Sequence, residues 1–469
     1  MTMTERIKPV WEHGKVHPDS PNKTFCTAPW VHTYISPQSE RRLCCASREE
    51  HVFQKQYIDA TNDEKYGEVR DSGTADDYRP VSLETHWNSD YMKDIRVKLL
   101  RGEKIPQCDV CNDSILSQST YRQWFTGHLF NHKIDEIYAN TSEDGHYEPL
   151  PISYDYRVSN LCNFKCRMCG EQLSSSWEAE KRKHDLWDAK NQPFMVPETK
   201  AKIQKFQREV VEAEFWQAAC AGIIEELYWV GGEPLMYDIH WRIMDRLEQD
   251  GNLDKVHLRY NSNLSRVRYG DHYLYDWLPK AKGWTMCASI DGTGAIGEFI
   301  RSGLNWSEWD ANFREGVALP HGNDRMIMDL TITGPGMFDL KRFVDYALEL
   351  DVRIETKRMF AFHPDIVFSP MAWPREILNR IIDDVLAYIK PRITHKQESV
   401  VRELEAMKTA PTFQEEWPDR AQEAFFRGRA WQDRIAEIRG REINMRIEDI
   451  YEDDPELYAW WTRPQRTSG

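Results

Sequence analysis

Apolar residues along the middle of the chain form short runs typical of strands, separated by longer stretches with helical spacing. The strand-like runs are 152–159, 224–230, 255–261, 284–291, 325–333 and 352–359. The helical stretches between several of them are 201–220, 238–249 and 340–350. Parallel strands need long crossovers, so this alternation predicts an α/β fold with a parallel sheet. Six such units fit a partial (β/α)6 barrel better than a closed eight-unit barrel.

The pattern of apolar and polar positions divides the chain into five segments. They are an irregular lead-in (1–25), a small cysteine-rich domain (26–125), a connector (126–150), the barrel (151–360) and a helical C-terminal extension (361–469). Other predicted helices are 90–101, 375–390, 396–408 and 422–439, and 61–80 is a predicted loop. The tryptophan-rich C-terminal helices are expected either to pack on the outside of the barrel or to cap its mouth.

Composition narrows the possible functions. The 469 residues carry a net charge of −15, which repels phosphate backbones and argues against general nucleic-acid binding. No apolar stretch approaches the roughly 20 residues of a membrane span, and the N-terminus lacks the apolar core of a signal peptide. A cytoplasmic protein is therefore expected.

Eight of the ten cysteines lie in clusters. In a reducing cytosol, clustered cysteines indicate metal ligands rather than disulfides. The two isolated cysteines, Cys220 and Cys287, are interpreted as small buried hydrophobic residues.

Three cysteines directly follow the first barrel strand. Cys162, Cys166 and Cys169 have the spacing Cys-x3-Cys-x2-Cys, and three thiolates can bind three irons of a 4Fe-4S cube and leave the fourth iron open. A structural zinc site would need a fourth ligand, and no His or Cys follows Cys169 within thirteen residues.

This triplet after a first strand resembles that of the radical S-adenosylmethionine (radical SAM) superfamily. The resemblance implies that the open iron binds SAM and that one electron, from a donor such as flavodoxin or ferredoxin, breaks SAM into methionine and a 5′-deoxyadenosyl radical. That radical would take hydrogen from a substrate. Met168 stands where many relatives have an aromatic residue, and a Met can fill the same space.

Further motifs support the resemblance. Gly231-Gly232-Glu233 follows the second strand, like the superfamily motif that binds the SAM amino group; read alone, two glycines would indicate only a turn. The third strand ends in Asn261-Ser262-Asn263, where the family has a polar strand end. Asn263 is the expected contact, although the sequence does not decide which Asn faces inward.

The fourth strand ends in Ser289-Ile290-Asp291, and Arg301 follows. This is similar to the family arrangement in which Ser contacts the SAM ribose and Arg pairs with the SAM carboxylate. Ser289 and Asp291 share one strand face. The alternative is a solvated turn with a surface arginine.

The N-terminal cysteines form a second pattern. Cys26 begins Cys-Thr-Ala-Pro-Trp, Cys44 and Cys45 are adjacent, Trp87-Asn88-Ser89 follows, and Cys108 and Cys111 have Cys-x2-Cys spacing. By spacing this is one soft-metal site that could hold zinc or a 4Fe-4S cluster.

The order of these pieces is similar to that of SPASM/twitch auxiliary-cluster domains, in the one-cluster twitch form, although those domains usually follow the barrel. The resemblance implies one auxiliary 4Fe-4S cluster rather than zinc. Its ligands would be Cys26, Cys44, Cys108 and Cys111, with Cys45 competing with Cys44.

Together these features predict an oxidoreductase-like radical SAM enzyme with the auxiliary cluster as electron acceptor. The favoured substrate is the side chain of a peptide or protein. One alternative is a small-molecule dehydrogenase that acts on a sugar alcohol or a cofactor precursor, and residues 1–25 are too short for the winged-helix domain that often binds peptide leaders. Another alternative is a non-catalytic iron–sulfur or zinc scaffold.

Overall fold

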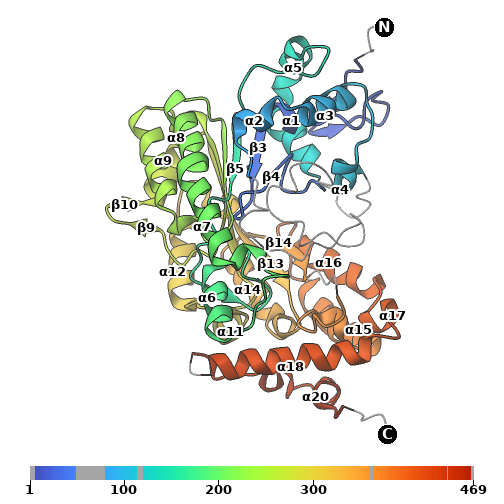
Figure 1. Cartoon of the computed structure of the whole chain (residues 1–469). Coiled ribbons are helices and arrows are strands. Elements are labelled where there is room, and N and C mark those ends of the chain that lie inside the picture. Colours follow the sequence, from blue (N-terminus) through green and yellow to red (C-terminus); the bar gives the residue numbers. More distant parts are fainter. Residues whose placement is uncertain (1–5, 49–79, 113–119, 360–362, 441, 466–469) are drawn as a thin grey trace. The chain divides into compact units, whose positions relative to one another are not determined.

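The computed structural model describes residues 6–48, 80–112, 120–359, 363–440 and 442–465 (Figure 1). The predicted loop 61–80 lies outside these residues apart from Pro80. The chain forms two compact units. Unit 1 contains Met1–Leu161, Glu171–Arg259 and Lys280–Gly283, and unit 2 contains Cys162–Gly170, Tyr260–Pro279 and Trp284–Gly469. The boundary passes through strand β8 (His257–Ser262).

Unit 1 holds one part of the parallel sheet. Its strands follow the order β4 (Arg41–Arg42), β3 (His32–Ile35), β5 (Ser153–Tyr156) and β7 (Glu226–Trp229). Strand β5 runs parallel to β3 and β7, and β4 runs antiparallel to β3. Strand β3 comes from the cysteine-rich segment, which therefore shares a sheet with the first predicted barrel strand.

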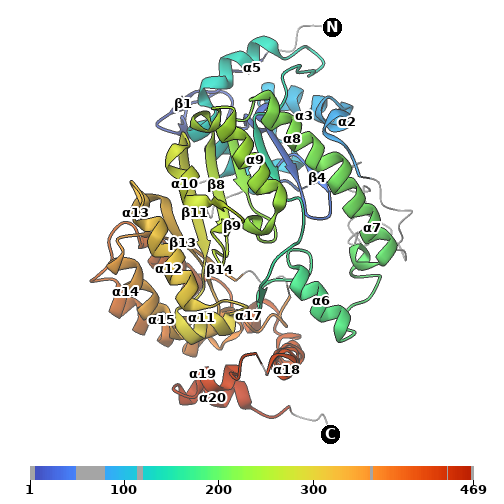
Figure 2. The same cartoon turned by 90° about the vertical axis from the view of Figure 1, so that its left-hand side faces the viewer.

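Helices cover this part of the sheet. The predicted helix 201–220 is a run of α7 (Pro197–Phe206), a π-helical turn (Gln207–Val211) and α8 (Glu212–Ala221). Helix α9 is Asp238–Gln249, as predicted. Figure 2 shows α8 and α9 side by side, and Phe215 of α8 stacks on Tyr154 of β5 with ring centroids 5.6 Å apart. The apolar face of these helices is therefore buried on the strands.

The cysteine-rich segment, with parts of the lead-in and of the connector, has its own small core. This region contains the hairpin of β1 (Trp11–Glu12) and β2 (Lys15–Val16) from the lead-in and the helices α1 (Ala28–Val31), α2 (Leu83–Trp87), α3 (Asp90–Leu100) and α4 (Asp109–Asn112). It also contains α5 (Ile134–Asn140) from the connector. Trp30, Leu99 and Ile137 are almost completely buried there. Ser89 begins α3 as predicted, because its hydroxyl accepts a hydrogen bond from the Met92 amide.

Unit 2 holds the other parallel strands. The order is β11 (Gly283–Ser289), β13 (Met326–Ile332) and β14 (Arg353–Arg358), and both neighbouring pairs are parallel. The connecting helices include α11 (Gly294–Ile300), α12 (Trp306–Val317) and α14 (Leu340–Glu349). The six predicted strands are thus present, and a mixed α/β fold with a parallel sheet is confirmed. Its closure into a partial barrel stays a prediction.

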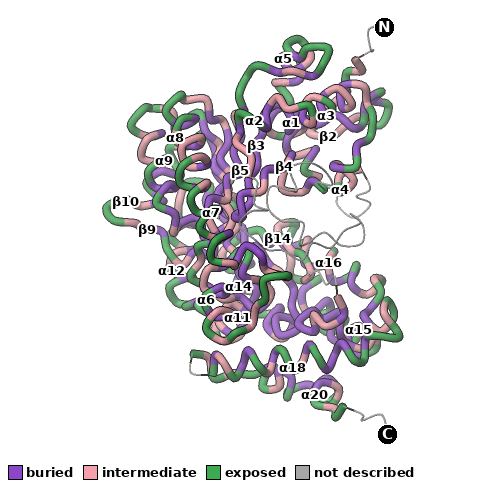
Figure 3. The backbone as a smooth tube through the Cα atoms, in the orientation of Figure 1, coloured by how far each residue is buried: buried purple, intermediate pink, exposed green. Residues whose placement is uncertain are grey.

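The C-terminal segment is helical. Its helices are α15 (Arg375–Ile389), α16 (Glu398–Thr409), α17 (Phe413–Glu416), α18 (Ala421–Arg439), α19 (Ile447–Tyr451) and α20 (Pro455–Thr462). In Figure 3 helix α18 alternates between buried and exposed stretches, typical of a helix with one packed face. None of the described helices is long and apolar enough to cross a membrane.

Candidate functional site

The cysteine triplet lies on a loop of unit 2 that a short two-stranded sheet holds in place. Strand β6 (Lys165–Cys166) pairs antiparallel with β12 (Arg301–Ser302), so that Cys166 lies opposite Arg301. The next amide, from Arg167, donates to the Ile300 carbonyl at 2.8 Å. The predicted cluster ligand and the predicted SAM-binding arginine are therefore direct neighbours across two short strands.

Two N–H donors lie against the sulfurs of this loop. Nδ2 of Asn263 is 3.8 Å from Sγ of Cys162, and Nη1 of Arg301 is 3.8 Å from Sγ of Cys166. Burial raises the pKa of the Cys166 thiol to about 12, and the nearby Arg301 charge opposes that rise. Donors of this kind favour the thiolate form that binds iron.

The structure shows different partners for Asn261 and Asn263, between which the sequence could not decide. Asn263 also bonds to Asn163 of the cysteine loop at 2.9 Å, whereas Asn261 donates to Asp329 of β13 at 3.2 Å. Asn263, placed by sequence among the SAM contacts, thus contacts the cysteine loop itself.

Gly303 lets the chain after β12 approach the cysteine loop. Its φ is +107°, and a Cβ at this position would lie 2.9 Å from the Asn163 carbonyl oxygen. A larger residue would force the two segments apart, because L-residues rarely adopt this φ and the contact is too short for a carbon.

The Gly-Gly-Glu motif lies in unit 1, just after β7. A Cβ on Gly232 would be 2.3 Å from the Leu161 carbonyl oxygen, and the Glu233 amide donates to that oxygen at 2.7 Å. The glycine therefore permits a close approach to the residue before Cys162. The side chain of Glu233 is 1% exposed, and its Oε1 accepts from the Leu235 amide at 3.1 Å.

Asp291 and Arg301 form a buried ion pair in unit 2. Oδ2 of Asp291 is 2.6 Å from Nε of Arg301, and Oδ1 of Asp291 accepts from the Thr331 amide at 2.8 Å. Burial raises the pKa of Asp291, and Arg301 opposes that rise. The alternative of a surface arginine is excluded, because the Arg301 side chain is only 11% exposed.

The strands of unit 2 have one apolar and one polar face. Met286, Ala288, Met328, Leu330 and Ile332 are buried on one face. The other face carries Ser289, Asp291, Asp329, Thr331 and Lys357, with registers Ser289↔Asp329 and Thr331↔Lys357. Lys357 forms an ion pair with Asp329, with distances of 2.8 and 2.9 Å from Nζ to the two carboxylate oxygens. The Lys357 side chain is 46% exposed. Both faces of a covered parallel sheet are normally apolar, so this polar face suits a binding surface.

Unit 1 has a similar polar face. Arg157 binds both carboxylate oxygens of Asp155 at 3.0 and 3.1 Å. Glu226 pairs with Arg259 at 3.0 Å and accepts from Ser153, whose hydroxyl is 2.7 Å from Nδ1 of His32. These groups were not predicted from the sequence, although polar residues at every second position of the predicted strands could have revealed them.

Four N-terminal cysteines surround one cavity of unit 1. Cys26, Cys44, Cys108 and Cys111 line one small cavity, together with Leu43, Gln107, Tyr121, Arg122 and Phe125. Burial raises the thiol pKa of Cys26 to about 11 and that of Cys108 to about 12. Uncharged thiols are therefore favoured there in the absence of a cation.

Cys45 does not line this cavity. Its pKa is raised to about 11, first by burial and then by Asp155, and Arg157 opposes the rise. Its thiol also forms a hydrogen bond with Tyr121. Cys44 therefore belongs with the other three cysteines, whereas Cys45 lies near the polar face of β5.

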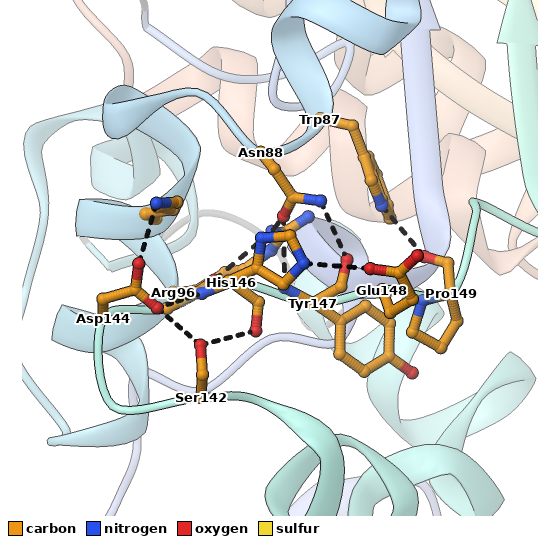
Figure 4. Close-up of polar contacts among 11 residues, drawn as sticks. Trp87, Asn88, Arg96, Ser142, Asp144, His146, Tyr147, Glu148 and Pro149 are labelled. Carbon is orange, nitrogen blue, oxygen red and sulfur yellow. Dashed lines mark hydrogen bonds and ion pairs between the residues drawn. The ribbon is translucent and has the colours of Figure 1, made fainter.

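The remaining pieces of the N-terminal pattern meet at Arg96 (Figure 4). Arg96 donates to the Pro29 carbonyl at 2.9 Å and to Oδ1 of Asn88 at 2.7 Å, and its guanidinium lies 4.7 Å from the Trp87 ring centroid. Asn88 and Trp87 in turn donate to the carbonyls of Tyr147 and Pro149. Arg96 of α3 thus joins the Pro-Trp segment that follows Cys26 to the Trp-Asn-Ser segment.

The donor sets fit four-iron clusters. Among the described residues, no three His, Cys, Asp or Glu side chains converge closely enough to hold a single metal ion. By number of thiols, three cysteines on one loop are enough for a 4Fe-4S cube with an open iron, and four around a cavity are enough for a fully ligated one.

The interpretation of the two isolated cysteines was wrong. Cys220 is exposed at the end of α8, and Cys287 is only partly buried. Cys287 lies two residues before Ser289, on the polar strand face. Position in an apolar stretch did not reveal which face each thiol occupies.

Comparisons with known proteins give weak matches. No protein-family profile and no curated protein matches the chain significantly. Streptococcus suis SuiB aligns over 65% of this chain at 13% identity and a TM-score of 0.33, and this chain spans 63% of the SuiB length. SuiB has also been solved with S-adenosylmethionine, matching 65% of this chain and 62% of that one at 12% identity and a TM-score of 0.32. TYW1 with a lysine-pyruvate adduct aligns over 48% of this chain and 70% of its own at 15% identity and a TM-score of 0.27. The functional assignment therefore rests on the residues of this chain.

Proposed function

We propose that the protein is a radical SAM enzyme that cleaves SAM reductively and abstracts hydrogen from a substrate C–H bond. The observation that carries the proposal is the loop of Cys162, Cys166 and Cys169, which presents three thiols with N–H donors against two of them. Bound there, a reduced 4Fe-4S cluster with SAM supplies a 5′-deoxyadenosyl radical.

The residues of the chain then bind and orient SAM. Gly231 and Gly232 allow a close backbone approach, and the buried Glu233 carboxylate suits the SAM ammonium group. Arg301 is held by Asp291 and suits the SAM carboxylate, and Ser289 suits the ribose. Burial of Glu233 and Arg301 strengthens both charge-assisted contacts because water competes less.

The second part of the proposal is an auxiliary 4Fe-4S cluster held by Cys26, Cys44, Cys108 and Cys111. Their shared cavity supports it. Four cysteine ligands leave no iron for a substrate, so the cluster would act as an electron acceptor. Arg122 lies beside Cys26 and Cys108, where its charge would offset the negative thiolates.

We propose a peptide or protein side chain as substrate and a flavodoxin- or ferredoxin-like protein as electron donor. The polar strand faces offer both donors and acceptors, such as Lys357 and Asp329, which suit peptide groups. A small sugar alcohol or cofactor precursor is the competing substrate class, and reaction of such a compound in place of a peptide would overturn this part.

The test is anaerobic reconstitution followed by iron analysis. The wild-type protein should bind about eight irons and form 5′-deoxyadenosine from SAM with a reductant. Replacement of Cys162, Cys166 and Cys169 by Ala should leave about four irons and abolish SAM cleavage. Retained cleavage by that variant would refute the proposed function.

Replacement of Cys26, Cys108 and Cys111 by Ala should remove about four irons and leave the SAM-binding cluster. That variant should still form 5′-deoxyadenosine, since hydrogen abstraction needs only the first cluster, but should not release oxidised product. Stoichiometric zinc in the wild-type N-terminal site would contradict the role of electron acceptor.

A further inference from the structure

We propose that helix α18 belongs to the cluster site, with Arg439 and Gln432 as positioning residues for the Cys162–Cys169 loop. The inference rests on the proposed cluster at that loop. It assigns the C-terminal segment a task beyond packing on the outside of the strands.

Arg439 contacts both strands of the short sheet β6–β12 that carries Cys166. It is completely buried, and its Nη1 donates to the Lys165 carbonyl at 2.8 Å and to Oγ of Ser302 at 3.1 Å. Lys165 directly precedes Cys166, and Ser302 directly follows Arg301 and pairs with Lys165. One guanidinium therefore fixes the chain next to the middle cysteine and next to the arginine opposite it.

Gln432 acts on the other side of Cys166. Its Oε1 accepts from Nη1 of Arg167 at 3.2 Å. The same guanidinium donates through Nε to the Phe299 carbonyl at 3.2 Å and lies 4.0 Å from the Phe299 ring centroid. Gln432 and Arg439 are seven residues apart, which places them on one face of α18 two turns apart.

A third contact also joins the C-terminal segment to the cysteine loop. Lys165 Nζ pairs with the Glu442 carboxylate, just beyond the end of α18, at 2.8 and 3.1 Å. Residues 165 and 167 are thus both tied to the C-terminal segment, and Cys166 lies between them.

The cysteine loop has little regular structure of its own. Strands β6 and β12 are two residues each, and such an isolated pair is marginally stable. A metal site needs ligands held by supporting residues, because loosely held ligands lose metal. The buried contacts of α18 supply that support from a part of the chain about 270 residues away.

The experiment measures iron release from the SAM-binding cluster alone. The background is the variant with Cys26, Cys108 and Cys111 replaced by Ala. It lacks the proposed auxiliary cluster, so all the iron that it binds belongs to the cluster of the Cys162–Cys169 loop. Arg439→Ala, Arg439→Lys, Gln432→Ala and Arg434→Ala are introduced there, reconstituted anaerobically and challenged with a chelator. Arg434 is the matched control, because it lies on α18 but is exposed and forms an ion pair with Glu437 of the same helix.

Arg439→Ala should release iron roughly tenfold or more faster, since a charge-assisted hydrogen bond corresponds to at least about one decade in an equilibrium constant. Arg439→Lys should recover part of this retention, because an ammonium keeps the charge but not the rigid fork. Gln432→Ala should show a smaller increase, and Arg434→Ala should match the background. The SAM-induced change in the cluster EPR spectrum should weaken in the same order.

Equal iron release by Arg439→Ala and Arg434→Ala would overturn the inference. If Arg439→Ala does not fold, as judged by circular dichroism, Gln432→Ala decides, and unchanged release then refutes the positioning role. Absence of a cluster from the triplet of the background protein itself would instead be a failure of the proposed function. The two failures are therefore distinguishable.

Discussion

At the scale of residues, the adjacent thiols of Cys44 and Cys45 have different surroundings. Cys44 lies among Cys26, Cys108 and Cys111 around one cavity, whereas Cys45 is near Asp155 and Tyr121. The two residues lie in a bend and turn that follow β4, where adjacent side chains leave the backbone in different directions. The spacing of the sequence could not decide between them, because their separations from the other cysteines differ by only one residue.

We therefore expect opposite results from two serine substitutions. Cys44→Ser should destabilise the auxiliary cluster and lower the reconstituted iron content from about eight towards about four. Cys45→Ser should keep both clusters, because it removes no ligand. Iron analysis and EPR spectra of the reduced proteins separate the two, and a loss of iron in Cys45→Ser alone would reverse the assignment.

Arg301 is the residue that we propose to pair with the SAM carboxylate. Its replacement by Ala should weaken SAM binding by one to two decades, since a charge-assisted bond to a carboxylate contributes about 1.5–3 kcal/mol. Arg314→Ala is the control, because Arg314 pairs with Asp310 and Glu349 at the surface. Isothermal titration with SAM measures both variants, and equal affinities would remove Arg301 from the SAM site.

At the scale of elements, the strands and helices whose apolar residues recur at regular spacing were predictable from the sequence. Helix α9 has the predicted bounds, and β13 and β14 lie within the predicted 325–333 and 352–359. Strand β3 was missed, because all four of its residues are buried and their sequence shows no alternation. Only its tertiary pairing with β5 makes it a strand.

The supporting contacts of the candidate site were the least predictable part. The cysteine and Gly-Gly-Glu motifs are local, so spacing identified them. Arg439 looks like any charged residue at a helix end, yet it contacts Lys165, 274 residues away in the chain. Contacts of this range follow from the whole fold and leave no pattern in a short window.

The close approach of Gly232 to Leu161 gives a prediction at this scale. Gly232→Ala would place a carbon 2.3 Å from a carbonyl oxygen, and relieving such overpacking costs typically about 1–3 kcal/mol. We expect a lower Tm and weaker SAM binding, because the displaced chain is the one that leads into Cys162. An unchanged Tm together with an unchanged SAM affinity in Gly232→Ala would show that this close approach to Leu161 is unimportant.

At the scale of the whole molecule, buried histidines make stability depend on pH. Burial lowers the pKa of His32 and of His240 to about 3, and His240 lies between the rings of Trp229 and Trp241. The folded protein keeps these rings neutral, whereas the unfolded chain takes up protons near pH 6.5. Their stabilisation is complete above that pH and is lost as the pH falls towards 3. The buried carboxyls of Asp155 and Asp291 have raised pKa values and act in the opposite direction.

His240→Phe tests this balance. Each such histidine contributes about 1.4 kcal/mol per pH unit below 6.5, so the fall in Tm between pH 7.5 and 5.5 should be roughly 1–3 °C smaller in the variant. Phe fits among the aromatic rings, and the exposed His146→Gln is the control. An unchanged fall in Tm would show that His240 does not contribute to the acid sensitivity.

Strand β3 has a consequence for the order in which the protein is made. All four cysteines around the N-terminal cavity leave the ribosome before β5, the parallel partner of β3, which begins at Ser153. At roughly 5–20 residues per second this interval lasts several seconds. During that time β3 can pair with β4 but not with β5. The segment that carries all four ligands of the proposed auxiliary cluster is therefore complete before the parallel strands can assemble on it.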